Sequence, residues 1–258
     1  MRIGFLIAGA QKCGTTAVFS ALSSHPDICP SSPKEVHFFD NDELFKDAFP
    51  DYTQYHKHFQ FHASNLLYGE ATPSYLYWKT APARIHAYNA DIKIIAILRN
   101  PIERAYSHWN MSVIKGNESL PFRQALLAES GRLASSTNGQ CKPHSYIDRG
   151  FYSLQIARYL DRFPRHNLLI LRHEDLVADF TKTYQDICEF LDINSPAQIS
   201  NQKKHTLPYK EPISQDDWQY LASLFCNDIT LLQKQLGWNC SHWLEYPGPQ
   251  KMMGTNVR

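Results

Sequence analysis

The sequence predicts an α/β protein in which one parallel β-sheet is covered by helices on both faces. Short, continuously apolar runs alternate with longer segments of helical periodicity, and such runs are typical of strands buried on both faces. The chain has 258 residues, of which 43% are hydrophobic. This length and composition suit a single domain, residues 1–258, around one buried core.

The elements follow in a strand-then-helix order. Each apolar run reads as a strand, and each segment with a 3.6-residue period reads as a helix. Asn100 and Pro101 form a helix-start signal, with Glu103 placed to complete a capping box. The predicted strands are 3–8, 92–98 and 167–171, and the predicted helices are 15–22, 101–115, 152–163, 180–191 and 216–236. Residues 130–149 are predicted to form a long flexible surface loop or lid, and 202–212 a second polar segment.

Charge and composition exclude several classes of function. Lys and Arg number 26 against 25 Asp and Glu, a formal charge of +1, so we expect no broad basic face for nucleic acid or membrane. The apolar run at residues 3–10 is too short to span a bilayer, and no small-residue cleavage site follows it, so we do not expect it to be a signal peptide. Six sparse cysteines predict reduced thiols in a cytoplasmic protein. The oligomeric state is left open.

The segment Gly9–Thr16 joins the first predicted strand to its helix and carries two glycines spaced as in a phosphate-binding loop. An ATP-binding loop has Lys directly after the second glycine, whereas position 15 is Thr and the only lysine is Lys12. Arg99, not a magnesium-binding Asp, follows the strand at 92–98. These features favour a ligand with a 5′ phosphate and no metal-bound triphosphate. The alternative is a glycine-rich turn that only packs helix on sheet.

Three motifs in order resemble the sulfotransferases that use 3′-phosphoadenosine 5′-phosphosulfate (PAPS), most of all the heparan-sulfate-type branch and its bacterial relatives. Gly9–Thr16 resembles the 5′-phosphosulfate loop, Leu98–Ser107 the 3′-phosphate motif, and Pro33–Asp40 the segment with the catalytic glutamate. The resemblance implies a P-loop-like fold, PAPS as co-substrate, the 3′,5′-diphosphate PAP as product, and no metal. The expected nucleotide-binding residues are Gln11, Lys12, Cys13, Gly14, Thr15, Thr16, Arg99, Ser107, Tyr152, Lys203 and Lys204.

Several of these residues also have a plainer interpretation. The Arg99 guanidinium and the Ser107 hydroxyl, two helical turns further on, can converge on one phosphate. The alternatives are a salt bridge of Arg99 at the end of its strand and an exposed helical serine at position 107. Lys203 and Lys204 resemble a basic loop over the nucleotide, and a solvated charge pair is the alternative. His56, His58 and His62 lack the carboxylate or cysteine partners of a metal site, so we expect none.

The acceptor needs a base to take its proton. The resemblance assigns this role to Glu35, while His37 and then His108 are the alternatives. If 34–39 is extended, alternation places Glu35 and His37 on one face. The same resemblance places Glu70 and Thr72 at the acceptor.

The acceptor is expected to be a small neutral or cationic metabolite, such as a natural product. Glycan-modifying relatives often carry Lys where this chain has Ala71, and three acids, Glu35, Asp40 and Glu70, lie in the acceptor-side motifs. The alternatives are a glycan sulfotransferase, a P-loop kinase using ATP and magnesium, and a non-catalytic nucleotide-binding protein.

Overall fold

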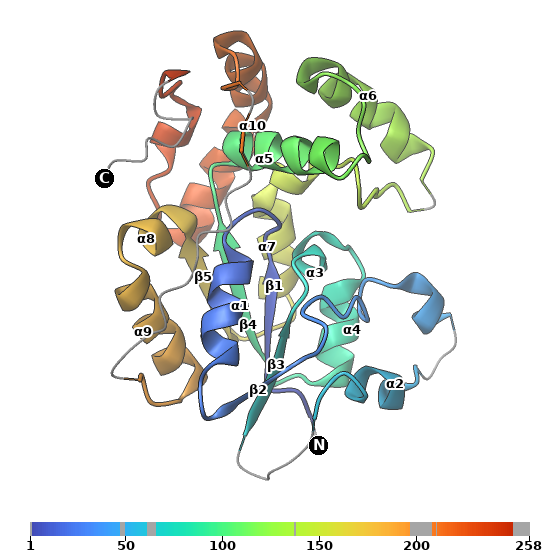
Figure 1. Ribbon diagram of the computed structural model, residues 1–258, viewed down its shortest axis with the longest axis vertical. Coiled ribbons are helices and arrows are strands. Elements are labelled where there is room, and N and C mark those ends of the chain that lie inside the picture. Colours follow the sequence, from blue (N-terminus) through green and yellow to red (C-terminus); the bar gives the residue numbers. More distant parts are fainter. Residues whose placement is uncertain are drawn as a thin grey trace. The chain divides into compact units, whose positions relative to one another are not determined.

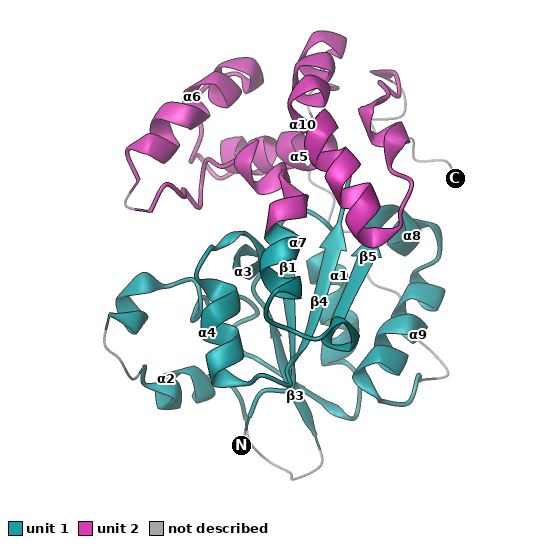
Figure 2. Ribbon diagram, turned by 180° about the vertical axis from the view of Figure 1, so that it is seen from behind, with its two compact units in different colours: residues 1–99, 155–205 teal, residues 100–154, 206–258 magenta. Residues whose placement is uncertain are grey.

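The computed structural model describes residues 2–46, 50–60, 66–136, 138–196, 208–209 and 211–249. The chain divides into two compact units (Figure 2). The first comprises residues 1–99 and 155–205, and the second comprises residues 100–154 and 206–258. The prediction of a single domain stays a prediction.

The first unit contains a five-stranded, entirely parallel sheet with the strand order β2-β3-β1-β4-β5 (Figure 1). Helix α1 covers one face and helix α4 the opposite face, as Figures 1 and 2 show from front and back. This is the predicted α/β, P-loop-like arrangement. The strands are β1 (Phe5–Gly9), β2 (Ile28–Pro30), β3 (Leu67–Ala71), β4 (Lys93–Leu98) and β5 (Leu168–Arg172).

Strand β3 lies between β2 and β1, although its sequence gave no apolar run. Gly69 is opposite Phe5 in the register, and a Cβ on Gly69 would approach the Phe5 ring to 2.1 Å. The glycine therefore makes room for an aromatic ring of the neighbouring strand. Glu70, the next residue, is fully buried.

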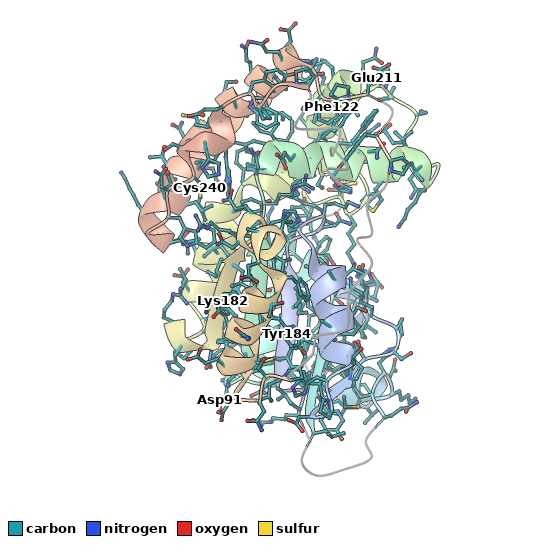
Figure 3. All side chains as sticks on the ribbon, turned by 60° about the vertical axis from the view of Figure 1, so that its left-hand side comes forward. Asp91, Phe122, Lys182, Tyr184, Glu211 and Cys240 are labelled. Carbon is teal, nitrogen blue, oxygen red and sulfur yellow. The ribbon has the colours of Figure 1, made fainter. Side chains whose placement is uncertain are left out.

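The helices of the first unit are α1 (Thr15–Ser23), α2 (Tyr52–His56), α3 (Ser74–Tyr77), α4 (Ala81–Tyr88), α8 (His173–Ala178) and α9 (Phe180–Leu191), with short 3-10 turns at Asp42–Phe45 and Arg165–Asn167. Helix α7 (Tyr152–Leu160) crosses the unit boundary. Amphipathic α9 packs on α1, where the Tyr184 hydroxyl donates to the carbonyl of Ala21 at 3.4 Å (Figure 3). Lys182 instead pairs with Asp186 on the solvent side of α9.

The second unit contains α5 (Pro101–Ile114), α6 (Phe122–Ala134) and α10 (Gln215–Leu236), with 3-10 turns at Asp148–Gly150 and Ser241–Leu244. Asn100 caps α5 as predicted, because its side chain accepts the amide of Ile102 at 2.9 Å. Two carboxylate–amide hydrogen bonds define the start of α7: Asp228 of α10 accepts the backbone N–H groups of Tyr152 and Ser153 at 2.8 and 3.2 Å.

The predicted loop at 130–149 is corrected at both ends. Helix α6 continues to Ala134, and residues 148–150 form a 3-10 turn. The buried Glu129 carboxylate accepts the amides of Ile147 and Asp148, both at 2.7 Å. Backbone groups that need an acceptor are thus satisfied by a side chain on α6, which ties this segment down.

None of the described helices is long and apolar enough to cross a bilayer. None of the six cysteines, all of which are described, forms a disulfide. Across the part of the chain that the structure describes, no group of three or more His, Cys, Asp or Glu side chains is placed to hold a metal ion.

Candidate active site

The phosphate-loop candidate lies at the end of β1, in the first unit. Gly14 is the N-cap of α1 at φ 88°, and none of the side chains that the structure describes caps the helix. The N–H groups of Thr15 and Thr16, together with the positive end of the helix dipole, are therefore placed to bind an anion, whereas the N–H of Ala17 donates to the carbonyl of Gly14 at 3.1 Å. Lys12, also left-handed at φ 70°, lies two residues before this N-cap. Thr15 is buried and Thr16 exposed.

Close packing shapes the loop. A Cβ on Gly9 would approach Leu76 to 2.5 Å, and one on Gly14 would approach Leu176 to 2.8 Å and His173 to 3.2 Å. The loop is also tied to β4, because the N–H of Ala10 donates to the carbonyl of Ile97 at 2.8 Å.

The residues around the loop fit a phosphate-bearing ligand. Cys13 is fully buried, and the buried Oε1 of Gln11 has no hydrogen-bond partner among the described residues. An ionised phosphate only accepts hydrogen bonds, so the donors that a nucleotide phosphate can use here are the helix amides and Lys12.

Arg99 follows β4 and lies near the residues that support the loop. Burial, and then the positive charge of Arg99, lowers the pKa of His173 to about 4. His173 therefore packs against Gly14 as a neutral ring beside the half-buried Arg99. The ring stays neutral because its protonated form would lose hydration and would be repelled by the charge of Arg99.

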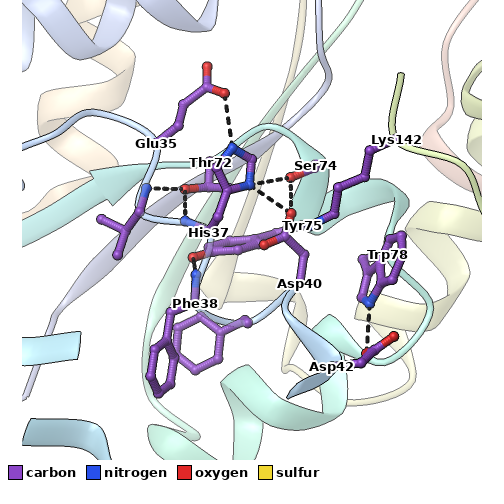
Figure 4. A network of polar contacts seen from close by, with 12 residues as sticks. Glu35, His37, Phe38, Asp40, Asp42, Thr72, Ser74, Tyr75, Trp78 and Lys142 are labelled. Atoms are coloured by element: carbon purple, nitrogen blue, oxygen red, sulfur yellow. Dashed lines mark hydrogen bonds and ion pairs between the residues drawn. The ribbon is translucent and has the colours of Figure 1, made fainter. Parts of the chain in front are cut away.

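The acceptor-side candidate consists of Glu35, His37 and Asp40 (Figure 4). The Nδ1 of His37 lies 2.9 Å from Oδ2 of Asp40, and its Nε2 lies 3.5 Å from Oε2 of Glu35. Ser74 also donates its hydroxyl to Asp40. The Asp40 carboxylate is buried, whereas the Glu35 and His37 side chains are each 44% exposed. The buried carboxylate of Asp40 thus holds the imidazole of His37 against the solvent-accessible carboxylate of Glu35.

The expectation of an extended, alternating segment at 34–39 was wrong. His37 has a φ of 56°, and the consecutive Phe38 and Phe39 are both buried. Glu35 and His37 nevertheless face each other, because the left-handed turn at His37 and its bond to Asp40 direct the ring. The two candidate bases are therefore neighbours in one hydrogen-bonded group.

Glu35 is an ionised carboxylate at neutral pH. Burial alone would raise its pKa, but the hydrogen bond from His37 and the charge and hydrogen bond of Lys34, 2.8 Å away, lower the pKa to about 2. Such a group can accept a proton but holds it weakly while both partners stay in place.

Glu70 and Thr72 lie in the interior of the first unit, both with no exposed surface. Thr72 donates to Oε2 of Glu70 at 2.6 Å and accepts the N–H of Val36 at 3.0 Å. This burial argues against the direct acceptor contact that their position in the sequence predicted. It also leaves Glu35 as the one exposed acid among the three acids, Glu35, Asp40 and Glu70, on which the expectation of a cationic acceptor depended.

The remaining candidates belong to the second unit or to the part not described. Ser107 on α5 and Tyr152 at the start of α7 are both buried, and His108 packs its ring on Tyr146 at 4.9 Å. Lys203 and Lys204 lie outside the described residues. The convergence of Arg99 with Ser107 stays a prediction.

Sequence reasoning missed the supporting roles of Asp40, Ser74 and His173. Asp40 could have been found, since a carboxylate three residues after a histidine is in reach when the chain turns. Ser74 and His173 carried no comparable signal, because their contacts depend on the packing of segments distant in the sequence.

Comparisons with known proteins agree with this geometry. Residues 3–211 match the model of the sulfotransferase domain. Heparan sulfate glucosamine 3-O-sulfotransferase 5 of Mus musculus is 29% identical over 198 residues, which are 76% of this chain and 54% of the mouse protein. The bifunctional heparan sulfate N-deacetylase/N-sulfotransferase 2 of Homo sapiens is 31% identical over 73% of this chain and 22% of its own length. The chain thus spans about half the length of the mouse relative, and less of the human one.

Among solved structures, a sulfotransferase from Alicyclobacillus acidocaldarius aligns with a TM-score of 0.82 and 28% identity, covering 95% of this chain and all of the other. The sulfotransferase domain of the curacin biosynthetic pathway, 16% identical with a TM-score of 0.54, shares the fold. Because the domain match extends over most of the sequence and includes both the phosphate loop and the Glu35 segment, the chain belongs to the sulfotransferase family.

Proposed function

We propose that this protein transfers a sulfuryl group from PAPS to a hydroxyl or amine. The proposal depends on two features of the first unit. One is the N-terminus of α1 beside Lys12, where none of the described side chains caps the helix, and the other is the ionised, solvent-accessible Glu35. The first suits a 5′-phosphosulfate, and the second suits removal of a proton from the acceptor. Gln11, Cys13, Gly14, Thr15, Thr16 and Arg99 complete the proposed nucleotide side in this unit.

The proposed chemistry is an in-line displacement at sulfur. PAPS supplies the sulfuryl group, and its bond from sulfur to the phosphate oxygen breaks as the bond from the acceptor to sulfur forms. Glu35 takes the proton of the acceptor, and Lys12 stabilises the charge left on the phosphate oxygen of PAP. Positioned charges of this kind typically contribute about 3–4 kcal/mol to a reaction barrier.

Nucleotide binding is the first test. We expect PAP to raise the melting temperature of the protein and ATP with magnesium to have a much smaller effect. The opposite ranking, followed by magnesium-dependent turnover of ATP, would favour a P-loop kinase. Stabilisation by PAP without transfer of labelled sulfate to any acceptor would favour a non-catalytic nucleotide-binding protein.

Glu35→Gln tests the base. The change keeps the size of the side chain and removes its ability to accept a proton, so we expect a loss of kcat of roughly 10² or more with unchanged PAP affinity. His37→Gln is the matched variant. If Glu35→Gln retains turnover and His37→Gln loses it, the base is His37.

For the acceptor we propose a small neutral or cationic metabolite, supported by Ala71 and by the formal charge of +1. A glycan is the second candidate, because the relatives at 29–31% identity are heparan sulfate enzymes and because Asp40 and Glu70 are buried. Labelled PAPS with a panel of small alcohols, amines and unsulfated glucosaminyl chains separates the two. Efficient sulfation of the chains alone would exclude the small acceptor.

A further inference from the structure

A buried carboxylate lies directly behind the segment with the two candidate bases. Glu70 has no exposed surface, and three hydroxyl groups donate to it: those of Tyr55 and Tyr75 to Oε1 at 2.8 and 2.9 Å, and that of Thr72 to Oε2 at 2.6 Å. These donors come from α2, α3 and the turn after β3. Three hydrogen bonds offset part of the cost of burying the charge.

Two of the three hydroxyls also bind the backbone of residues 36–38. Oγ1 of Thr72 accepts the N–H of Val36 at 3.0 Å and lies 3.5 Å from that of His37. The hydroxyl oxygen of Tyr75 accepts the N–H of Phe38 at 3.0 Å. The amides at the left-handed turn of His37 therefore have side-chain acceptors in place of a strand partner.

The direction of these hydrogen bonds depends on Glu70. Each hydroxyl has a single proton, and an ionised carboxylate can only accept. While Glu70 is ionised, Thr72 and Tyr75 turn their protons toward it, and their lone pairs face the amides of Val36 and Phe38. A protonated Glu70, or a glutamine at position 70, would itself donate a hydrogen bond. At least one of the hydroxyls would then have to turn its proton away from residue 70.

We propose that Glu70 is a positioning residue for the proposed base, acting through Thr72 and Tyr75 to hold the turn at His37 and so the contact between His37 and Glu35. The proposal rests on the proposed function for its effect on turnover, but the structural effect on residues 36–38 does not depend on it. Glu70 touches neither donor nor acceptor of the sulfuryl group in this role.

The geometry also implies a dependence on pH. Burial raises the pKa of Glu70 to about 7, although its three hydroxyl partners lower it. The titratable groups around it are Tyr55, Tyr75 and Tyr88, with Asp40 beyond Tyr75, and burial raises the pKa of each of the three tyrosines. Glu70 changes charge near neutrality, so at least one of the hydroxyls loses its fixed direction as the pH falls below about 7.

Stability and positioning respond to pH in opposite ways. The folded-state pKa of Glu70 lies above its usual value of 4.5, so the folded protein binds more protons than the unfolded chain between about 4.5 and 7. The contribution of Glu70 to stability therefore falls as the pH rises through that range. The ionised form thus lowers stability while it fixes the turn.

Glu70→Gln tests the proposal, with hydrogen exchange of the backbone amides of residues 36–38 as the main measurement. We expect these amides to exchange at least tenfold faster at pH 8, while those of α1 are unchanged. We also expect kcat to fall at least tenfold with unchanged PAP affinity, and the remaining turnover to lose the dependence on pH around 7. Glu129→Gln is the matched control, since burial also raises the pKa of that acid to about 7 in the second unit. It should leave exchange at 36–38 unchanged.

Thr72→Ser and Thr72→Val give a second, independent comparison if Glu70→Gln does not fold. Serine keeps the hydroxyl and should retain slow exchange and turnover, whereas valine keeps the shape and should lose both. Wild-type exchange at residues 36–38 in Glu70→Gln, or equal behaviour of the two Thr72 variants, would overturn the proposal. If the wild-type protein transfers no sulfuryl group at all, the proposed function fails, and the exchange data still decide the role of Glu70.

Discussion

Replacing Gly14 with alanine perturbs the phosphate loop in two separable ways. The residue has a φ of 88°, where an L-residue costs roughly 1–2 kcal/mol. The new Cβ would also lie 2.8 Å from Leu176 and 3.2 Å from His173, and relief of such overpacking typically costs about 1–3 kcal/mol. We expect Gly14→Ala to lower the free energy of unfolding by about 2–5 kcal/mol.

Gly116→Ala isolates the backbone cost. Gly116 has a φ of 73°, and a Cβ there would meet nothing within 4 Å. We expect this variant to lose only about 1–2 kcal/mol. The difference between the two variants, measured by urea denaturation, then reports the contacts with Leu176 and His173. Unfolding of both variants at the same free energy would refute the packing argument.

The same pair of variants distinguishes a phosphate loop from a structural turn. Gly14→Ala displaces the backbone at the N-cap of α1, so we expect PAP affinity, measured by calorimetry, to fall at least tenfold. Gly116→Ala should bind PAP as the wild type does. If Gly14→Ala folds and keeps full affinity, the α1 N-terminus is not the phosphate site.

Three further predictions concern single side chains. Lys12→Ala should lower kcat roughly 10²- to 10³-fold, because the negative charge that develops on the leaving phosphate oxygen is no longer stabilised by a cation. Steady-state rates with labelled PAPS measure this effect, and a near-normal kcat would contradict the role of Lys12. Lys34→Met should raise the pKa of Glu35 from about 2 toward its usual 4.5, so that turnover is lost at a higher pH on the acid side. Carbon-13 NMR of the Glu35 carboxyl group measures the pKa, and an unchanged titration midpoint would contradict the prediction. Asp228→Ala should lower the free energy of unfolding by about 1–3 kcal/mol, because two amides at the start of α7 lose their acceptor. Asp228→Asn should lower the free energy of unfolding by less, because its side-chain oxygen can still accept a hydrogen bond. If the wild type and Asp228→Ala have the same free energy of unfolding, the cap does not stabilise the fold.

The parts of the fold that the sequence predicted are those with a local signal. Strands β1, β4 and β5 are apolar runs, and α5 begins at a recognisable cap, so their bounds agree with the prediction within two residues. Strand β3 has Gly69 and Glu70 at its centre and gave no such signal. Its glycine accommodates Phe5, and its glutamate is solvated by hydroxyls from Tyr55 and Tyr75, so neither is explained by its sequence neighbours.

The candidate site shows the same limit. Gly9–Thr16 was predictable because a glycine-rich turn between strand and helix depends on adjacent residues. The conformation of 34–39 was not, because the turn at His37 is held by Thr72 and Asp40, and periodicity within the segment contains no information about either contact. Alternation therefore predicted that Glu35 and His37 lie together, which the structure also shows, but for a reason that the structure does not support.

The cap that Asp228 provides has a consequence for where the functional domain ends. The family match stops at residue 211, yet Asp228 and Phe225 lie beyond it on α10. A Cβ on Gly150 would approach the Phe225 ring to 2.6 Å, so α10 packs closely on the turn that precedes α7. A fragment that ends at residue 211 would lack Asp228, which accepts the Tyr152 and Ser153 amides, and Phe225, which packs against Gly150. The family match therefore ends before contacts that complete the second unit, and we expect a chain that ends at residue 211 to be less stable than one that retains α10.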